Sequence, residues 1–339
     1  SNTNAFCTGP DDPAVGITVS PGENVVCTFT NTPLGSATII KNTVGGDDIF
    51  DVTGDDPFNG LQLETVAGTA SRDYNYELLG AYTVTEAPIP SGWVLTNVGC
   101  EEDGIADSSG ANPSALLNVE LLETVTCTFT NTADGTLIIR KEAIPEVEQP
   151  FEFTGDAAGV IFDYSASANQ IEVSGQPGTY TSNELVPPGW QVTDINCTGQ
   201  VQSGVTYGDT DVSVDLAAGE TVICTFENTA TGSITIEKVT GGGPGIFTFN
   251  RSGDFSGSFP LDTAVSNPAS ETFDDLLPGN YMVSELVPPN WTLASINCSG
   301  DDASTITIGG EGGFVQGDTA VTVDLLDGED ITCTFTNVA

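Results

Sequence analysis

Hydrophobic and polar side chains alternate along four seven-residue segments, each of which ends in asparagine. In residues 125–131 ("VTCTFTN"), Val125, Cys127, Phe129 and Asn131 share one parity, and threonines occupy the other. Because side chains alternate between the two faces of a β-strand, this pattern predicts a half-buried strand whose asparagine points into the core. The related segments are "VVCTFTN" (25–31), "VICTFEN" (222–228) and "ITCTFTN" (331–337).

The terminal asparagines recur after 100, 97 and 109 residues, so each period has the size of one small domain. Short strand-like segments alternate with turns rich in Gly, Pro, Asn and Asp, and almost no 3.6-residue periodicity is present. We therefore expect an all-β chain of tandem antiparallel β-sandwiches with about seven strands each. The expected units are an incomplete repeat with terminal strands only (1–34), repeat 1 (35–132), repeat 2 (133–229) and repeat 3 (230–339).

The same parity argument places one lysine and one glutamate on the buried face of every full repeat. The lysine follows a glycine by six residues in the opening strand, and the glutamate follows a tyrosine by four residues in a middle strand. Three of the six basic residues of the chain occupy this one repeat position. With the asparagine they make three predicted triads: Lys41, Glu86 and Asn131; Lys141, Glu184 and Asn228; Lys238, Glu285 and Asn337.

A buried lysine must either pair with another group or react covalently, because an unpaired ammonium in a core costs several kcal/mol. One hypothesis is a buried Lys–Glu ion pair that is hydrogen-bonded to the asparagine. The favoured hypothesis is an autocatalytic cross-link, in which burial lowers the lysine pKa and the neutral amine attacks the asparagine carboxamide. A protonated glutamate would polarise the amide and pass protons, ammonia would leave, and an isopeptide bond would remain.

The repeats resemble the prealbumin-like B-type repeats of Gram-positive collagen adhesins and the related domains of sortase-assembled pilins. The segment "YTVTEAPIPSGW" (82–93) is similar to the family pattern Y-x-V-x-E-x-x-x-P-x-G, although tryptophan replaces the usual tyrosine. In that family, a lysine of the first strand bonds to an asparagine of the last strand with help from the glutamate of this pattern. The resemblance covers the three full repeats and implies the bonds Lys41–Asn131, Lys141–Asn228 and Lys238–Asn337.

Eight cysteines recur at repeating positions in a chain without histidine and without a CxxC motif. This pattern favours disulfides over free buried thiols and indicates an oxidising, extracellular location. Eight cysteines permit about 105 connectivities, but each neighbouring pair brackets one hairpin, so we expect pairing within units. The expected pairs are Cys7–Cys27, Cys100–Cys127, Cys197–Cys224 and Cys298–Cys333.

The formal net charge of −42 argues against nucleic acids and anionic membranes as partners. The chain has no run of about 18 apolar residues, so no membrane span is expected, and any signal peptide or anchor would lie outside this sequence. Acidic groups at 45–56, 100–104 and 208–215 make surface calcium a candidate ligand. None of them has the spacing of a calcium-binding loop, so no cofactor is expected.

Catalysis on an external substrate is not expected, because histidine is absent and no phosphate-cradling glycine loop follows a strand. A two-carboxylate hydrolase is the residual enzymatic alternative. The tryptophans that follow the Pro-Gly or Pro-Asn turns repeat next to the cysteines, which favours core packing over a carbohydrate platform. They are Trp93, Trp190 and Trp291.

Residues 1–34 contain Cys7, Cys27 and Asn31 but no upstream lysine or glutamate. Either they are the end of a preceding repeat of a longer array, or they form an intersubunit contact by strand exchange or edge addition. We expect an extracellular structural protein that forms a stalk or a head-to-tail homopolymer. The alternative is an adhesin with a ligand site, for which the insertion at 300–320 is the one candidate.

Overall fold

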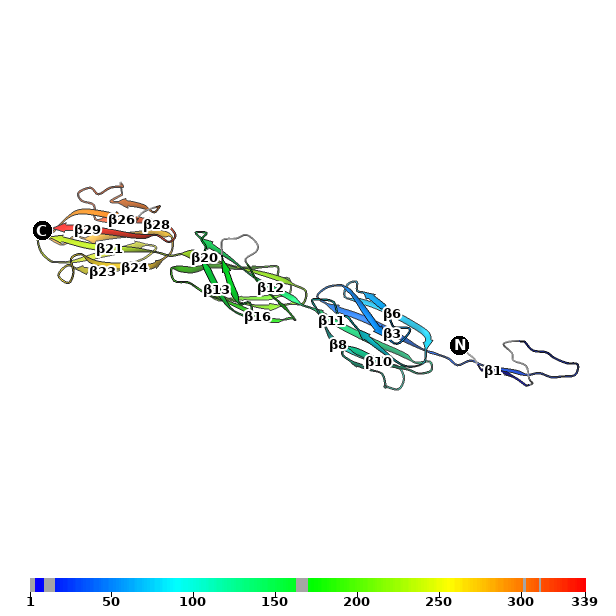
Figure 1. Cartoon of the computed structure of the whole chain (residues 1–339). Helices are drawn as coiled ribbons and strands as arrows, with labels where there is room; N and C mark the ends of the chain where they lie inside the picture. The colour runs from blue at the N-terminus through cyan, green and yellow to red at the C-terminus, as the bar shows by residue number, and fades with distance from the viewer. Residues whose placement is uncertain (1–3, 9–15, 163–169, 301–302, 311) are drawn as a thin grey trace.

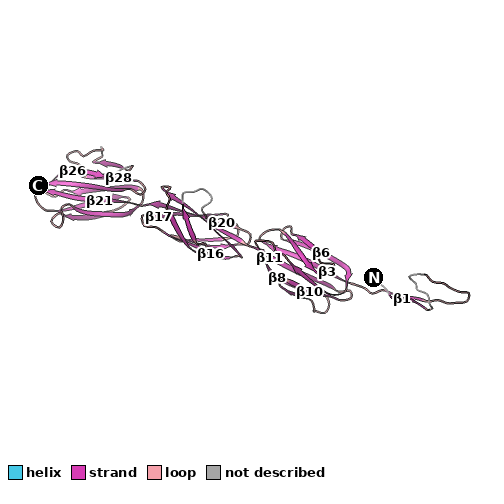
Figure 2. Cartoon of the chain, in the orientation of Figure 1, coloured by secondary structure: helices cyan, strands magenta, loops and turns pink. Residues whose placement is uncertain are grey.

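The computed structural model describes residues 4–8, 16–162, 170–300, 303–310 and 312–339, and these form β-strands and no helix (Figure 2). A two-stranded N-terminal hairpin precedes three β-sandwiches that follow one another in a row (Figure 1). The hairpin consists of β1 (Asn4–Cys7) and β2 (Cys27–Thr30). Part of the insertion at 300–320, namely residues 301–302 and 311, lies outside the described residues.

Each sandwich pairs a four-stranded sheet with a five-stranded sheet. Repeat 1 contains β3 (Gly35–Val44), β4 (Ile49–Gly54), β5 (Leu61–Glu64), β6 (Thr69–Leu78), β7 (Gly80–Glu86), β8 (Trp93–Glu102), β9 (Ser109–Ala111), β10 (Ser114–Val119) and β11 (Thr124–Ala133). Repeat 2 contains β12 (Gly135–Ile144), β13 (Pro150–Gly155), β14 (Gly159–Phe162), β15 (Ile171–Gly175), β16 (Gly178–Leu185), β17 (Trp190–Thr198), β18 (Gly204–Tyr207), β19 (Asp211–Leu216) and β20 (Thr221–Ala230). Repeat 3 contains β21 (Gly232–Gly241), β22 (Ile246–Gly253), β23 (Gly257–Asp262), β24 (Ala269–Leu276), β25 (Gly279–Leu286), β26 (Thr292–Ser299), β27 (Thr305–Ile308), β28 (Ala320–Leu325) and β29 (Asp330–Val338).

The all-β sandwich architecture is confirmed, but each described repeat has nine strands rather than about seven. In repeat 1, the strand orders are β6-β3-β11-β8 and β5-β4-β7-β10-β9. The edge strands β5 and β9 have four and three residues. Strands this short contain too few alternations to be recognised from hydrophobic periodicity, which explains the difference.

The first and last strands of every repeat run parallel in the centre of the four-stranded sheet. In repeat 1, β3 pairs with β11 so that Lys41 lies opposite Phe129 and Thr43 opposite Asn131. Val125, Cys127, Phe129 and Asn131 are at most 1% exposed, so the predicted inward face of this strand is confirmed. The pairing brings the opening lysine and the terminal asparagine, far apart in sequence, to adjacent strands.

Each repeat has its own hydrophobic core between its two sheets. The three tryptophans are partly buried, and each packs edge-to-face against the first phenylalanine of the strand after the opening strand. The ring centroids are 5.3 Å apart for Trp93 and Phe50, and 5.4 and 5.2 Å apart in repeats 2 and 3. The tryptophans therefore form an outer layer of aromatic packing at the edge of each core.

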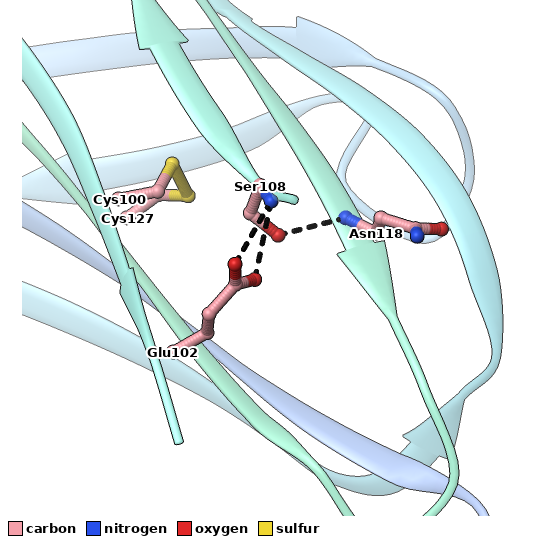
Figure 3. The surroundings of a disulfide bond; sticks show 5 residues. All are labelled: Cys100, Glu102, Ser108, Asn118 and Cys127. Carbon is pink, nitrogen blue, oxygen red and sulfur yellow. Dashed lines mark hydrogen bonds between the residues drawn. A yellow bond between two sulfur atoms is a disulfide. The ribbon is translucent and has the colours of Figure 1, made fainter. Parts of the chain in front are cut away.

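The four disulfides are Cys7–Cys27, Cys100–Cys127, Cys197–Cys224 and Cys298–Cys333, the pairings that the repeat pattern predicted. Each joins two residues that lie directly opposite each other on neighbouring antiparallel strands. Figure 3 shows the surroundings of Cys100–Cys127, where Glu102 accepts hydrogen bonds from the backbone N–H of Ser108. The Ser108 hydroxyl in turn accepts from the backbone N–H of Asn118. The bridge ties the last strand β11 to β8, and the hydrogen bonds connect β8 and β10 through Ser108.

Successive repeats are joined by single residues, Asp134 between β11 and β12 and Thr231 between β20 and β21. The backbone N–H of each donates to the carbonyl of a turn glycine, at 2.8 and 2.9 Å. At the first junction, Gln176 of repeat 2 also donates to the Asp134 carboxylate at 2.8 Å. The linkers between repeats are therefore single residues whose backbone N–H groups are hydrogen-bonded to the preceding repeat.

Candidate functional site

The candidate site of each repeat is its buried triad, which is assembled from three strands of two sheets. In repeat 1, Lys41 lies on β3 and Asn131 on β11 of the four-stranded sheet, and Glu86 ends β7 of the facing sheet. The alternation of each strand turns these polar side chains inward among hydrophobic neighbours. All three residues are at most 1% exposed.

In repeat 1, the triad is closed by three direct contacts. The Lys41 Nζ lies 2.6 Å from Asn131 Oδ1 and 3.1 Å from Glu86 Oε2. The Asn131 Nδ2 donates to Glu86 Oε1 at 2.5 Å. The glutamate therefore touches both the amine and the amide nitrogen, and the asparagine carboxamide lies between the other two groups.

Repeat 3 has the same arrangement. The Lys238 Nζ lies 2.6 Å from Asn337 Oδ1 and 3.3 Å from Glu285 Oε2, and Asn337 Nδ2 donates to Glu285 Oε1 at 2.5 Å. The Lys238 Nζ also donates to the backbone carbonyl of Phe335 at 2.9 Å. The two triads therefore match closely although almost 200 residues of chain separate them.

Repeat 2 brings the same three residue types together with a different geometry. The Lys141 Nζ donates to the carbonyls of Glu142 at 2.7 Å and Phe226 at 3.0 Å, and lies 4.0 Å from Glu184 Oε2. The Asn228 Nδ2 donates to Glu184 Oε1, whereas Asn228 Oδ1 accepts no hydrogen bond. In this repeat the lysine amine is turned toward backbone carbonyls.

A phenyl ring lines each lysine pocket. The Nζ atoms of the three lysines lie 4.2, 4.4 and 4.6 Å from the ring centroids of Phe50, Phe151 and Phe247. These are the rings on which the partly exposed tryptophans pack. The ring supplies the low-dielectric wall that desolvates the amine, and the tryptophan separates that ring from solvent.

Burial shifts the pKa of four triad residues in the direction that favours their neutral forms. Burial lowers the pKa of Lys41 from its ordinary value of 10.5 to about 8, although the Glu86 carboxylate offsets part of the shift. Lys238 behaves alike, with a pKa of about 8 and Glu285 as its partner. Burial also raises the pKa of Glu285 and of Glu184, and the neighbouring lysines oppose that shift.

A β-bulge lies next to the asparagine in every repeat. In repeat 1, Thr130 pairs with Asn97 and Asn131 with Leu95, so that Thr96 of β8 is unpaired. The register shifts at the equivalent place in repeats 2 and 3. Bulges of this kind re-aim side chains next to functional sites. The repeated bulge therefore belongs to the local geometry that positions the asparagine.

All nine triad residues that the sequence predicted are buried and lie within their own repeats. The phenyl rings under the lysines and the β-bulges were missed by the sequence analysis. Phe50, Phe151 and Phe247 follow their lysines by nine or ten residues, which was a usable signal. The bulges leave no comparable trace, because one unpaired residue does not alter the alternation of the partner strand.

The arrangement can move a proton between the lysine amine and the leaving nitrogen of the asparagine through one carboxyl group. In repeats 1 and 3, one glutamate oxygen faces Nζ and the other faces Nδ2. A carboxyl group that touches both nitrogens satisfies the geometric requirement for general acid–base catalysis. The arrangement in repeats 1 and 3 is therefore consistent with acyl transfer from asparagine to lysine.

The chain belongs to the SpaA-type family described as "Prealbumin-like fold domain", which matches residues 37–133, 137–230 and 234–339. A second family of the same description matches residues 1–33. A search of curated proteins found no match. The resemblance in the sequence to prealbumin-like repeats is thereby confirmed.

Several solved structures of bacterial surface proteins are similar to this chain. The Bacillus anthracis TIE protein is 16% identical over 94% of this chain and 53% of its own, with a TM-score of 0.32. The pilus adhesin SpaC of Lactobacillus rhamnosus GG is 14% identical over 94% and 45%, with a TM-score of 0.27. BcpA, the major pilin subunit of Bacillus cereus, is 10% identical over 90% and 99%, with a TM-score of 0.33. The chain therefore spans about half the length of the first two.

Metal and membrane sites were sought in the part of the chain that the structure describes. No group of three or more Asp, Glu, His or Cys side chains there could hold a metal ion. No helix among the described residues is long and apolar enough to cross a membrane.

Proposed function

We propose that each repeat forms an autocatalytic isopeptide bond, between Lys41 and Asn131, Lys141 and Asn228, and Lys238 and Asn337. Glu86, Glu184 and Glu285 act as the assisting acid–base groups. The close contact of Nζ with the asparagine Oδ1, 2.6 Å in repeats 1 and 3, is the observation that carries the proposal. The lowered pKa of Lys41 and Lys238 supports it, because only the neutral amine is a nucleophile.

The reaction conserves all atoms without an external reagent. The lysine lone pair forms a bond to the asparagine Cγ, while a protonated glutamate donates a hydrogen bond to the amide and polarises it. The glutamate then passes its proton to Nδ2 through one carboxyl oxygen and takes a proton from the attacking nitrogen through the other, which leaves it protonated as before. The Cγ–Nδ2 bond breaks, ammonia leaves, and a Lys–Asn amide remains. No activity on an external substrate is part of this proposal.

The first test is the intact mass of the denatured and reduced protein. Loss of three ammonia molecules, mapped by peptide sequencing to the three Lys–Asn pairs, is the expected result. The full calculated mass would overturn the proposal and leave three buried ion pairs in disulfide-braced sandwiches.

We further propose that the protein is an extracellular structural element, a covalently braced stalk or a head-to-tail filament on a cell surface. In each repeat the chain enters through the first strand and leaves through the last, and the proposed bond joins these two strands. A force applied to both ends would pass through the bond and bypass the roughly 90 residues between Lys41 and Asn131. Four disulfides support the extracellular placement.

Stretching single molecules of the full chain tests the structural role. We expect no unfolding step of a whole repeat before the chain detaches, because each repeat is clamped. Extension by about one repeat length per event would contradict the clamp. Electron microscopy of native material then tests polymerisation, and isolated monomers would contradict a filament.

A ligand-binding or adhesive role is the second candidate, and one observation favours it. Two adjoining grooves of about 260 and 360 Å³ lie beside β17 in repeat 2. Trp190, Tyr207, Asp194 and Asp209 line them, which combines aromatic faces with carboxylates. Binding of a saccharide or amine to the intact chain that is lost in Trp190→Ala would support this role.

A further inference from the structure

In repeats 1 and 3, an amide side chain covers part of an edge strand of the four-stranded sheet. Leu95 of β8 and Leu293 of β26 lie opposite the triad asparagine of the last strand. The Leu95 carbonyl accepts a hydrogen bond from Asn112 Nδ2 at 2.6 Å, and the Leu293 carbonyl accepts one from Gln316 Nε2 at 3.2 Å. At this position of both repeats, an outward carbonyl of the edge strand is thus capped by a side-chain donor.

Repeat 2 has a carboxylate where repeat 1 has the capping amide. The backbone N–H of the triad glutamate donates to the carbonyl of Pro113 in repeat 1 and to that of Thr210 in repeat 2. Asn112 and Asp209 directly precede these residues and are therefore equivalent. The residue opposite the triad asparagine in repeat 2 is Val192. An ionised carboxylate accepts hydrogen bonds and donates none, so Asp209 cannot cap the Val192 carbonyl.

The two grooves beside β17 (Figure 2) meet at this position, because Val192 and Asp209 line both of them. Trp190 lines one groove, and Tyr207, which is 47% exposed, lines the other together with Asp194. Among the described residues, no side chain donates to the Val192 carbonyl, and neither aspartate accepts a hydrogen bond or forms an ion pair. The described lining contains no basic residue. The grooves thus combine two carboxylates, an uncapped carbonyl and two aromatic side chains.

We propose that these grooves bind the ammonium group of a lysine side chain on a partner protein. An ammonium group has three donors and no acceptor, which matches the Asp209 carboxylate and the Val192 carbonyl. Trp190 and Tyr207 supply the ring faces that attract a cation. The net charge of −42 draws basic partners toward the chain. The inference rests on the ligand-binding role considered above and names the group that the grooves take.

The charge of the lining favours an ammonium group over a neutral saccharide. A saccharide could stack on the same rings and bond to the same oxygens, but it would leave the charges of Asp209 and Asp194 uncompensated. An ammonium group pairs with a carboxylate through charge-assisted hydrogen bonds, which are roughly twice as strong as neutral ones. The replacement of an amide by a carboxylate therefore changes this position from a closed contact to a cation site.

Titration of the full chain with the peptide acetyl-Gly-Lys-Gly-amide, followed by NMR, tests the inference. Two matched peptides carry Nε-acetyl-lysine or norleucine in place of lysine, which keep the aliphatic stem and lack the charge. We expect the backbone amides of Thr193, Asp209 and Thr210 and the indole N–H of Trp190 to shift with the lysine peptide alone. Equal binding of the three peptides would overturn the inference.

Two variants of repeat 2 locate the binding site. Asp209→Asn, which introduces the amide of repeat 1, should weaken binding of the lysine peptide by roughly tenfold, because a charge-assisted hydrogen bond is lost. Asp215→Asn removes the same charge from an exposed position of β19 outside the described lining and should leave the affinity unchanged. An unchanged affinity in Asp209→Asn, or an equal loss in both variants, would overturn the proposed site.

Titration with glucose and N-acetylglucosamine separates this inference from the role on which it rests. If a saccharide shifts the same amides and the lysine peptide does not, the lysine assignment is wrong and the ligand-binding role stands. If none of these ligands shifts them, the lysine assignment is wrong and the grooves no longer support a ligand-binding role.

Discussion

Repeats 1 and 3 close their triads, whereas repeat 2 holds the same three residues in a looser arrangement. The lysine Nζ lies 3.1 and 3.3 Å from the glutamate in repeats 1 and 3, but 4.0 Å from it in repeat 2. In repeats 1 and 3 the asparagine Oδ1 accepts from the lysine at 2.6 Å, and in repeat 2 it accepts no hydrogen bond. Residue identity at the three positions therefore does not determine the geometry of the triad.

The distance from the lysine Nζ to the glutamate is 0.7 to 0.9 Å longer in repeat 2 (4.0 Å against 3.3 and 3.1 Å), which is the scale that matters for acyl transfer. A misplacement of about 1 Å can cost roughly 100-fold in rate, because the reacting atoms must meet in a narrow range of distances and directions. The lysine of repeat 2 must first give up its hydrogen bonds to Glu142 and Phe226. One chain thus allows a comparison of two triads whose side chains are all in contact, in repeats 1 and 3, with a triad whose lysine is turned away, in repeat 2.

The largest expected effect is the loss of cross-linking when the glutamate is removed. Glu285→Ala should slow bond formation in repeat 3 by roughly 10²–10⁴-fold, because the proton path between the two nitrogens is lost. The variant should then lose two ammonia molecules, whereas the parent chain loses three. Glu271→Ala, an exposed residue of the same repeat, is the matched control and should leave the mass deficit unchanged. Normal cross-linking in Glu285→Ala would contradict the assigned role.

The next effect is on the free energy of unfolding, whose change has opposite signs for a cross-link and for an ion pair. Combining Lys238→Met with Glu285→Gln removes both charges and approximately keeps their volume. A cross-link that closes a loop of 99 residues should stabilise repeat 3 by about 4–5 kcal/mol, which the double variant would lose. A buried ion pair replaced in this way should leave the free energy of unfolding unchanged or raise it. Chemical denaturation followed by a probe in repeat 3 measures which sign holds.

A smaller effect should be a slower rate of bond formation in repeat 2 than in repeats 1 and 3. When the chain is refolded from the denatured, uncross-linked state, we expect the Lys141–Asn228 bond to form roughly tenfold more slowly than the other two, or slower still. Quenching samples at intervals and mapping the three peptides gives the three rates. Equal rates would show that the looser arrangement of repeat 2 has no kinetic consequence.

The mildest effect should be the dependence on pH, which repeats 1 and 3 ought to share. With a lysine pKa of about 8, roughly one tenth of the amine is neutral at pH 7. The rate should therefore rise as the pH approaches 8, since the neutral amine is the nucleophile, and fall once the glutamate loses the proton that the reaction needs, which gives a bell-shaped profile. A lysine with its ordinary value of 10.5 would instead shift the maximum of the profile to higher pH. Refolding at a series of pH values separates these curves.

Much of this molecule could be predicted from local sequence. Alternation with a period of two assigned Phe129 and Asn131 to the core, and the same rule placed Lys41 and Glu86 beside them. The spacing of the cysteines within repeated hairpins identified all four disulfides. These features depend on neighbours in the chain or on repetition, both of which are visible in a single sequence.

The tertiary structure decided the features that depend on distances between strands and between sheets. It placed Phe50 under the Lys41 amine, put a bulge opposite Asn131 and turned Lys141 toward two carbonyls in place of the closed triad. Sequence alternation determines the face on which a side chain lies, but the atoms that meet it come from remote strands, and their positions follow from packing.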